Sequence, residues 1–166
     1  MKSHFSIVIW MLAISMLMKM LVFAGGYQFT DYEKIYFFGN LFIIMVGTFL
    51  GIRLFKNIHV EKTTFLADVK AGMKVAGMYA VLMSFFVYVY YTYIDVDYFE
   101  IKLSRQLELM AESGADKLAL NQARKTGGFV LSPYFQSTVT LILYLLFGSF
   151  YASIITFFVR KVRNER

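Results

Sequence analysis

The sequence contains no cysteine, and this absence removes several kinds of chemistry at once. Disulfide bonds, thiolate metal sites and thiol nucleophiles are all excluded. Charge is also scarce, because 17% of the residues are charged whereas 58% are hydrophobic. Soluble domains contain about a quarter charged residues. The excess of apolar residues is concentrated in long blocks, which is typical of an integral membrane protein.

Histidine is nearly absent too, and no catalytic motif is present. His4 and His59 have no metal-ligand neighbour at helical spacing, and the sequence has no GxSxG, Walker or HExxH motif. We therefore expect no enzymatic activity, no cofactor and no metal site. The formal charge of +6 would suit a nucleic-acid partner, but the basic residues lie mainly between and after the apolar blocks. This distribution indicates a membrane protein without a nucleic-acid partner.

Four apolar blocks predict an all-α polytopic membrane protein that forms a single domain over residues 1–166. The blocks cover Phe5–Gly25, Ile35–Phe55, Met73–Ile94 and Ser137–Val159. Each has about 20 residues, the length that crosses ~30 Å of hydrocarbon. Since the backbone must satisfy its own hydrogen bonds in lipid, we expect each block to be a helix. Lys19 interrupts the first block, so we expect a retained span rather than a cleaved signal peptide.

Lysine and arginine predict the orientation of these spans. The basic residues at the N-terminus, in the second link and after the fourth span are Lys2, Arg53, Lys56, Lys62, Lys70, Lys74, Arg160, Lys161, Arg163 and Arg166. Cytoplasmic segments of membrane proteins carry such an excess. We therefore place both ends of the chain in the cytoplasm and the long link Asp95–Gln136 on the outside.

Small residues four positions apart predict where the helices pack. They let helix backbones approach closely, which matters because lipid provides no hydrophobic drive between helices. The candidate packing residues are Gly47, Gly51, Gly72, Ala76, Ala80, Ser84, Gly148 and Ala152. This pattern fits a compact bundle and fits equally a face for a partner subunit.

Lys19 is the residue that the bilayer disfavours most, because it lies inside the first span. Its stem can extend to the outer headgroups. Alternatively, it pairs with an anionic lipid or with an acid near the outer surface. The candidate acids are Asp31, Glu33, Asp95 and Asp97. Asn40, early in the second span, is a candidate for a hydrogen bond between helices. We group Lys19, Asn40, Asp95 and Asp97 as a candidate lipid or ion-pair site.

The external link Asp95–Gln136 contains an amphipathic helix that Asp97 can cap. The residues of its apolar face, at intervals of four, four and three, are Phe99, Leu103, Leu107 and Met110. We expect Gly114 to break this helix, a second stretch to cover Ala115–Lys125, and Gly127–Gly128 to end that stretch. The apolar face predicts a helix that lies on the outer leaflet or caps the bundle, or one that docks an external partner.

The stretch from Thr63 to Met110 resembles a known family. The run Phe65–Gly72 (FLADVKAG) leads into an apolar helix that ends in Tyr90–Phe99 (YYTYIDVDYF). These motifs, the four-span layout and the chain length are similar to domain of unknown function 4199, a family of four-helix inner-membrane proteins from the Bacteroidota. Val96 stands where that family usually has proline. The resemblance covers essentially the whole chain, implies a bacterial inner membrane, and supplies no catalytic residues.

Two functions fit the sequence. The first is a non-enzymatic accessory or scaffold subunit of a larger inner-membrane complex, which docks through its small-residue stripes and its external helix. The second is a small transporter or lipid-binding protein that acts as a homo-oligomer, with its substrate near Lys19, Asn40 and the outer aromatic residues. Membrane lipids and other membrane subunits are the expected partners.

Overall fold

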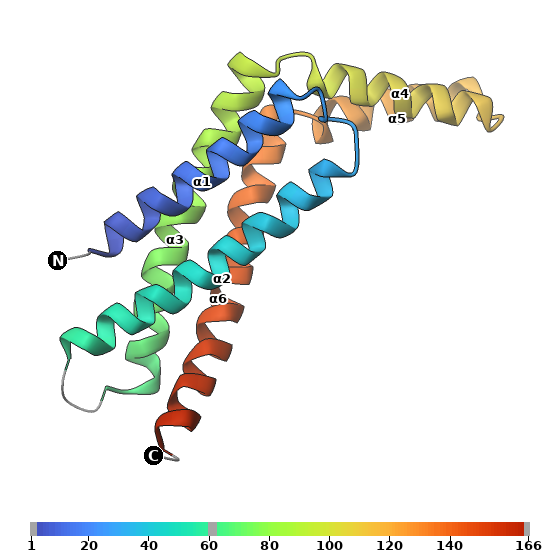
Figure 1. Ribbon diagram of the computed structural model, residues 1–166. Coiled ribbons are helices and arrows are strands. Elements are labelled where there is room, and N and C mark those ends of the chain that lie inside the picture. Colours follow the sequence, from blue (N-terminus) through green and yellow to red (C-terminus); the bar gives the residue numbers. More distant parts are fainter. Residues whose placement is uncertain (1–2, 60–62, 165–166) are drawn as a thin grey trace. The chain divides into compact units, whose positions relative to one another are not determined.

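A computed structural model describes residues 3–59 and 63–164 of the chain (Figure 1). The described residues form helices and no strand. The elements are α1 (His4–Ala24), α2 (Tyr32–Ile58), α3 (Phe65–Val89), the π-helical turn η1 (Tyr90–Ile94), α4 (Tyr98–Glu112), α5 (Lys117–Val130) and α6 (Pro133–Asn164). Lys2, Lys62 and Arg166, which entered the predicted orientation, lie outside the described residues, as does the side chain of Arg163.

The four predicted spans are confirmed as helices. α1, α2, α6 and the continuous pair α3–η1 are each long and apolar enough to cross a membrane. α3 begins upstream of the predicted span start at Met73, since a helix capped by Thr64 runs into the span as its sequence predicts, and α6 begins earlier than the predicted Ser137, because polar residues cap both helices. Thr64 Oγ1 accepts a hydrogen bond from the Ala67 amide at 3.3 Å, and Ser132 Oγ accepts one from the Phe135 amide at 3.3 Å.

The chain divides into two compact units. The first consists of residues 1–83 and 141–166, and the second of residues 84–140. The first unit therefore contains α1, α2 and the larger parts of α3 and α6. The second contains the end of α3, η1, α4, α5 and the start of α6.

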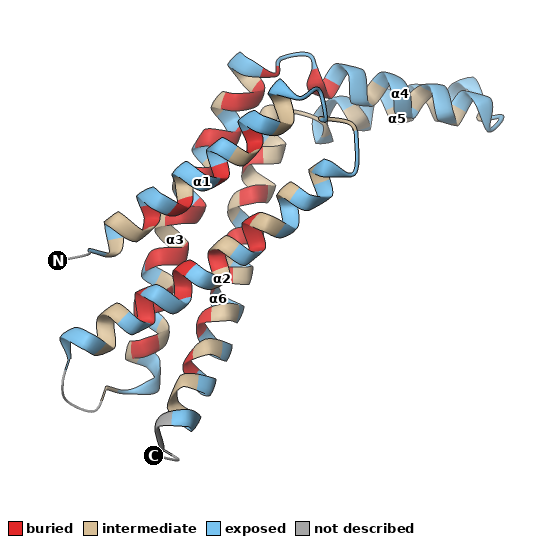
Figure 2. Cartoon of the chain, in the orientation of Figure 1, coloured by how far each residue is buried: buried red, intermediate tan, exposed pale blue. Residues whose placement is uncertain are grey.

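Polar and small side chains share the interior of the first unit with large apolar ones, and its buried positions are red in Figure 2. Residues with no exposed surface include Ser15, Asn40, Ala76, Tyr79 and Ala80. Large apolar side chains that are more than half exposed include Trp10, Leu17, Phe38 and Leu146. This arrangement suits a bilayer, because lipid tails solvate apolar side chains whereas polar groups must find partners inside the protein.

In the second unit, α4 and α5 form a helical hairpin, visible side by side in Figure 1. As expected, the first helix ends before Gly114, whose φ of 85° lies in the left-handed region that glycine tolerates. Asp116 then caps α5, because its Oδ1 accepts a hydrogen bond from the Ala119 amide at 2.7 Å.

Two local predictions about this hairpin are wrong. The second helix does not end at Gly127–Gly128, because α5 continues to Val130. Gly127 lies against the Leu103 side chain, so this glycine allows close approach of α4 rather than termination. Asp97 precedes α4 but makes no side-chain capping bond. Its backbone is already helical, at φ −85° and ψ −5°, whereas capping side chains usually need an extended conformation.

Candidate functional site

Glycines bring α2 and α3 unusually close in the first unit. A Cβ added at Gly51 would lie 2.6 Å from Val75 Cγ2, and one added at Gly72 would lie 2.9 Å from Thr48 Cγ2. These separations are shorter than side chains tolerate, so the two backbones pack at a distance that requires glycine. Each helix thus contributes one glycine to the same contact.

The other predicted packing residues have different neighbours. Gly47 lies against the Met11 side chain of α1. The glycines of α2 thus contact both α1 and α3. A Cβ added at Gly148 of α6 would lie 2.6 Å from the Ala76 Cβ. The fully buried small residues are Ala76, Ala80 and Ala152. In the second unit, Ser84 Oγ donates a hydrogen bond to the Ser137 carbonyl at 2.9 Å, which joins α3 to α6.

Lys19 is buried, with 4% of its surface exposed. Its Nζ lies 3.6 Å from Glu33 Oε1 in the first turn of α2 and 5.3 Å from the centroid of the Tyr36 ring. The carboxylate and the ring face together compensate the charge within the protein. Of the four acids considered from the sequence, the structure thus places Glu33 beside Lys19.

Asn40 is fully buried and hydrogen bonded on both sides of its amide. Its Nδ2 donates to the Tyr36 carbonyl at 2.8 Å, and its Oδ1 accepts from Tyr79 Oη at 2.7 Å. Tyr79 Oη lies 2.5 Å from Ser15 Oγ. Since the Tyr79 proton goes to Asn40, Ser15 is the donor of this last bond. A chain of hydrogen bonds therefore ties α1, α2 and α3 together.

Aromatic stacking extends this polar cluster to α6. The rings of Tyr79 and Tyr144 stack with centroids 5.7 Å apart and an interplanar angle of 13°, and Tyr144 is 5% exposed. Each side of the Asn40 amide and of the Tyr79 hydroxyl is used within the protein. This arrangement ties four helices together through polar and aromatic contacts.

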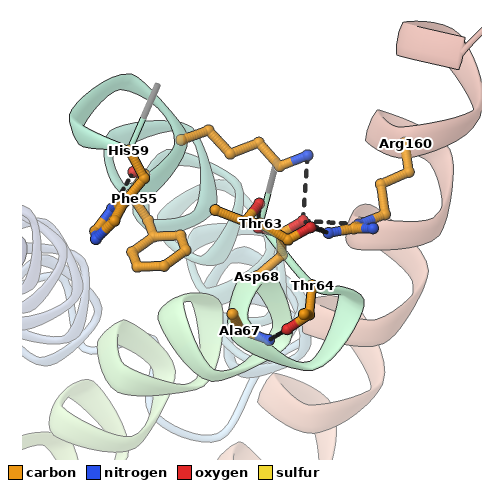
Figure 3. Close-up of polar contacts among 8 residues, drawn as sticks. Phe55, His59, Thr63, Thr64, Ala67, Asp68 and Arg160 are labelled. Atoms are coloured by element: carbon orange, nitrogen blue, oxygen red, sulfur yellow. Dashed lines mark hydrogen bonds and ion pairs between the residues drawn. The ribbon is translucent and has the colours of Figure 1, made fainter. Parts of the chain in front are cut away.

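Asp68, near the start of α3, forms a second buried cluster (Figure 3). Its Oδ2 lies 2.8 Å from Arg160 Nη2 and 3.2 Å from Lys56 Nζ, and Arg160 Nε donates to the same oxygen at 2.8 Å. Asp68 Oδ1 accepts a hydrogen bond from Thr63 Oγ1 at 2.6 Å. Arg160 Nη2 also donates to the Thr63 carbonyl. One carboxylate with no exposed side-chain surface thus joins α2, α3 and α6.

The two predicted carboxylates after η1 have different environments. Asp95 is 8% exposed, and its Oδ2 accepts a hydrogen bond from Tyr90 Oη at 2.9 Å. Asp97 is exposed. Asp95 belongs to the second unit whereas Lys19 belongs to the first. Of the candidate site residues, Lys19 and Asn40 thus belong to the first unit and the two aspartates to the second.

The predicted docking face of α4 has contacts within the second unit, because Phe99 lies against the rings of Tyr91 and Tyr98 and Leu103 lies against Gly127 of α5. Phe99 is buried, and the residues that are half-buried along the same face are Leu103, Leu107 and Met110. The facing half-buried positions of α5 are Ala119, Leu120, Ala123 and Gly127. Part of the apolar face of α4 is thus buried within the second unit. Other large apolar side chains of the hairpin remain exposed.

Sequence reasoning missed Ser15, Tyr79 and Arg160 as members of these clusters. Arg160 is 92 positions from Asp68, and no local pattern connects residues so far apart. A signal for Ser15 did exist. The buried positions of α1 are Val8, Met11, Ser15 and Lys19, so the two polar residues lie four apart on one helical face.

Among residues 3–59 and 63–164 no group of three or more histidine, aspartate or glutamate side chains could hold a metal ion. No curated protein and no solved structure matches the chain. A family model does match, over residues 6–161, and its description is "Protein of unknown function (DUF4199)". Because the match covers nearly the whole chain, this four-helix membrane protein belongs to the DUF4199 family.

Proposed function

We propose that the protein is a non-enzymatic accessory or scaffold subunit of a larger assembly in the bacterial inner membrane. Its docking element is the α4–α5 hairpin. One observation carries this proposal: α5 exposes large apolar side chains on the face opposite its contact with α4. Leu118 and Phe129 are 67% and 64% exposed.

These two side chains lie on one surface of α5, because they are about three helical turns apart. Gln122 and Lys125, which are exposed between them, provide polar positions along the same stripe. Leu109 of α4 adds a third large apolar side chain, with 66% exposure. Apolar anchors within a polar surround are typical of protein interfaces. The partner surface is therefore expected to be apolar with a polar rim.

The basic residues support an orientation with cytoplasmic termini. Arg53 and Lys56 lie in the last turns of α2, and Arg160 and Lys161 lie in those of α6. The hairpin follows α3, a span that starts from this basic end. In this orientation the hairpin lies on the outer side, where it meets the external part of a partner.

The charged groups inside the first unit support a structural role. Lys19 forms an ion pair with Glu33, and Asp68 forms ion pairs with two cations. Such pairs stabilise a defined helix arrangement. A general base or a nucleophile needs instead an accessible group with a tuned pKa.

The double variant Leu118→Glu with Phe129→Glu tests this function. The protein is purified at native expression level in mild detergent, and co-purifying proteins are quantified by mass spectrometry. We expect the parent chain to retain a partner in fixed stoichiometry and the variant to lose at least about nine-tenths of it. Ser104→Glu, an exposed change on α4, is the matched control and should retain the partner.

Two results would contradict the proposal. One is a parent chain that purifies as a lone protomer both from native membranes and from detergent. The other is a partner that binds the double variant as well as it binds the Ser104→Glu control. Circular dichroism and size-exclusion profiles equal to those of the parent establish that the variants are folded.

A further inference from the structure

An open apolar groove runs between α1 and α2 in the first unit, and its polar end, at Ser6, Arg53 and Asn57, lies far along both helices from Lys19 and Glu33. Its volume is about 890 Å³, within the range of roughly 300–1,000 Å³ that is usual for small-molecule sites. The apolar walls include Ile7, Trp10, Met11, Ile14, Phe42 and Val46. The groove is thus large enough for a bound molecule and lies on a surface built for contact with lipid.

The polar lining of this groove is gathered at one end. Ser6 lies at the start of α1, whereas Arg53 and Asn57 lie in the last turns of α2, four residues apart and so on one helical face. Arg53 is exposed, and the ion pairs of the described part of the chain do not include it. A cation, an amide and a hydroxyl therefore meet at the end of an apolar channel.

We propose that this groove binds one phospholipid with an anionic headgroup. The guanidinium of Arg53 receives the phosphate, because its planar fork matches phosphate oxygens, and Asn57 and Ser6 supply further hydrogen bonds. An acyl chain lies along the apolar walls. The lining runs from Ser6 to Met18 on α1, about 18 Å at the helical rise, close to one leaflet of a ~30 Å hydrocarbon core.

The groove walls fit an acyl chain better than another helix. Close helix packing needs accessible small residues, but Gly39 is covered by the Met18 side chain and Gly47 by that of Met11. Methionine is flexible and adapts to an irregular, mobile occupant. The positive charge of Arg53 at one end then selects the lipid by its headgroup. This binding site is independent of the proposed docking role of the hairpin.

The proposal is tested by native mass spectrometry in two sets of nanodiscs. One contains a phosphatidylglycerol and the other a phosphatidylcholine with the same acyl chains. We expect the parent chain to retain one lipid, with at least about tenfold preference for phosphatidylglycerol. Arg53→Gln should abolish this preference while zwitterionic lipid is still retained. Val46→Trp, which fills the apolar channel, should reduce retention of both lipids.

Lys161→Gln is the matched control, because Lys161 is an exposed cation on α6 that does not line the groove. It should leave the lipid preference unchanged. Equal retention of both lipids by the parent chain would overturn the proposal. So would an equal loss of preference in Lys161→Gln and Arg53→Gln, or a dimer that excludes lipid from the α1–α2 face. Inorganic phosphate added to the phosphatidylcholine discs should not raise retention.

Discussion

The helical bundle of the first unit and the α4–α5 hairpin of the second differ in what they do with polar side chains. In the first unit, the polar residues Ser15, Asn40 and Asp68 have no exposed surface and lie in the interior together with apolar residues, while many other large apolar side chains face outward. In the hairpin, apolar side chains such as Leu103 turn inward and charged ones are exposed, and α5 has no buried residue at all. The same chain thus follows the rules of two solvents, lipid for the bundle and an aqueous or interfacial medium for the hairpin.

The largest expected effect comes from Asp68, because its removal leaves two cations without their carboxylate. Asp68→Ala should lower the free energy of unfolding by about 3–5 kcal/mol, the usual range for breaking a buried ion pair. Thermal unfolding in mild detergent measures the loss. Combining Asp68→Leu with Lys56→Met and Arg160→Met should recover most of it, since all the charges are then removed together. Asp97→Asn, an exposed acid, should have no effect.

Close packing in the bundle is tested next by a matched pair of glycines. Gly51→Ala places a Cβ 2.6 Å from Val75 Cγ2 and 3.3 Å from the Ala71 carbonyl oxygen, so it should destabilise the bundle by about 1–3 kcal/mol. At Gly77 the nearest atom is 3.9 Å from an added Cβ. Gly77→Ala should therefore be neutral or stabilising. If both variants lose the same stability, helix separation is not what Gly51 controls.

The hydrogen-bond chain of the bundle predicts a smaller effect. Tyr79→Phe removes one hydroxyl that bonds both Asn40 and Ser15, and it should cost about 1 kcal/mol, as is found for hydrogen bonds between membrane helices. Ser15→Ala added to Tyr79→Phe should cost less than it does alone, because the shared partner is already gone. Tyr93→Phe, at an exposed tyrosine, is the control. Strictly additive losses in the double variant would contradict a hydrogen-bond chain that links Ser15 to Tyr79.

The smallest global effect is expected in the hairpin. Leu103→Ala removes a half-buried contact with Gly127 and should weaken the local stability of the hairpin by about 1 kcal/mol. Hydrogen exchange of the α5 amides should then become faster. The unfolding temperature of the bundle should not change. A lower unfolding temperature of the bundle in this variant would show that the two units do not respond separately to substitution.

The spans could be predicted from the sequence because membrane thickness fixes their length and composition. The candidate packing residues could also be found, since Gly47 and Gly51 lie four residues apart in the sequence, as do Gly72 and Ala76. Their partners could not, because Gly47 lies against a methionine of α1 rather than against a small residue. In lipid, the identity of a neighbour depends on how helices are arranged, which no local spacing encodes.

Charged and polar contacts were still harder to predict. Lys19 could be recognised because a charge inside a membrane span is costly. Four acids were possible partners, and the structure places Glu33 beside it. Asp68 gave no such signal, because an acid in the first turn of a helix is ordinary. Gly127 was misread for a related reason: a glycine that ends a helix and one that admits a neighbouring Leu103 look the same in a sequence.

Site-specific photocrosslinking in native membranes tests the docking role of the hairpin most directly. A photoreactive residue is placed at Leu118 in one chain and at Ser104 in another. We expect one discrete adduct of defined mass from position 118 and at most a tenth of that amount from position 104, because Leu118 lies on the proposed docking surface whereas Ser104 does not. No adduct from either position, or equal adducts from both, would contradict the proposal that this face docks a partner.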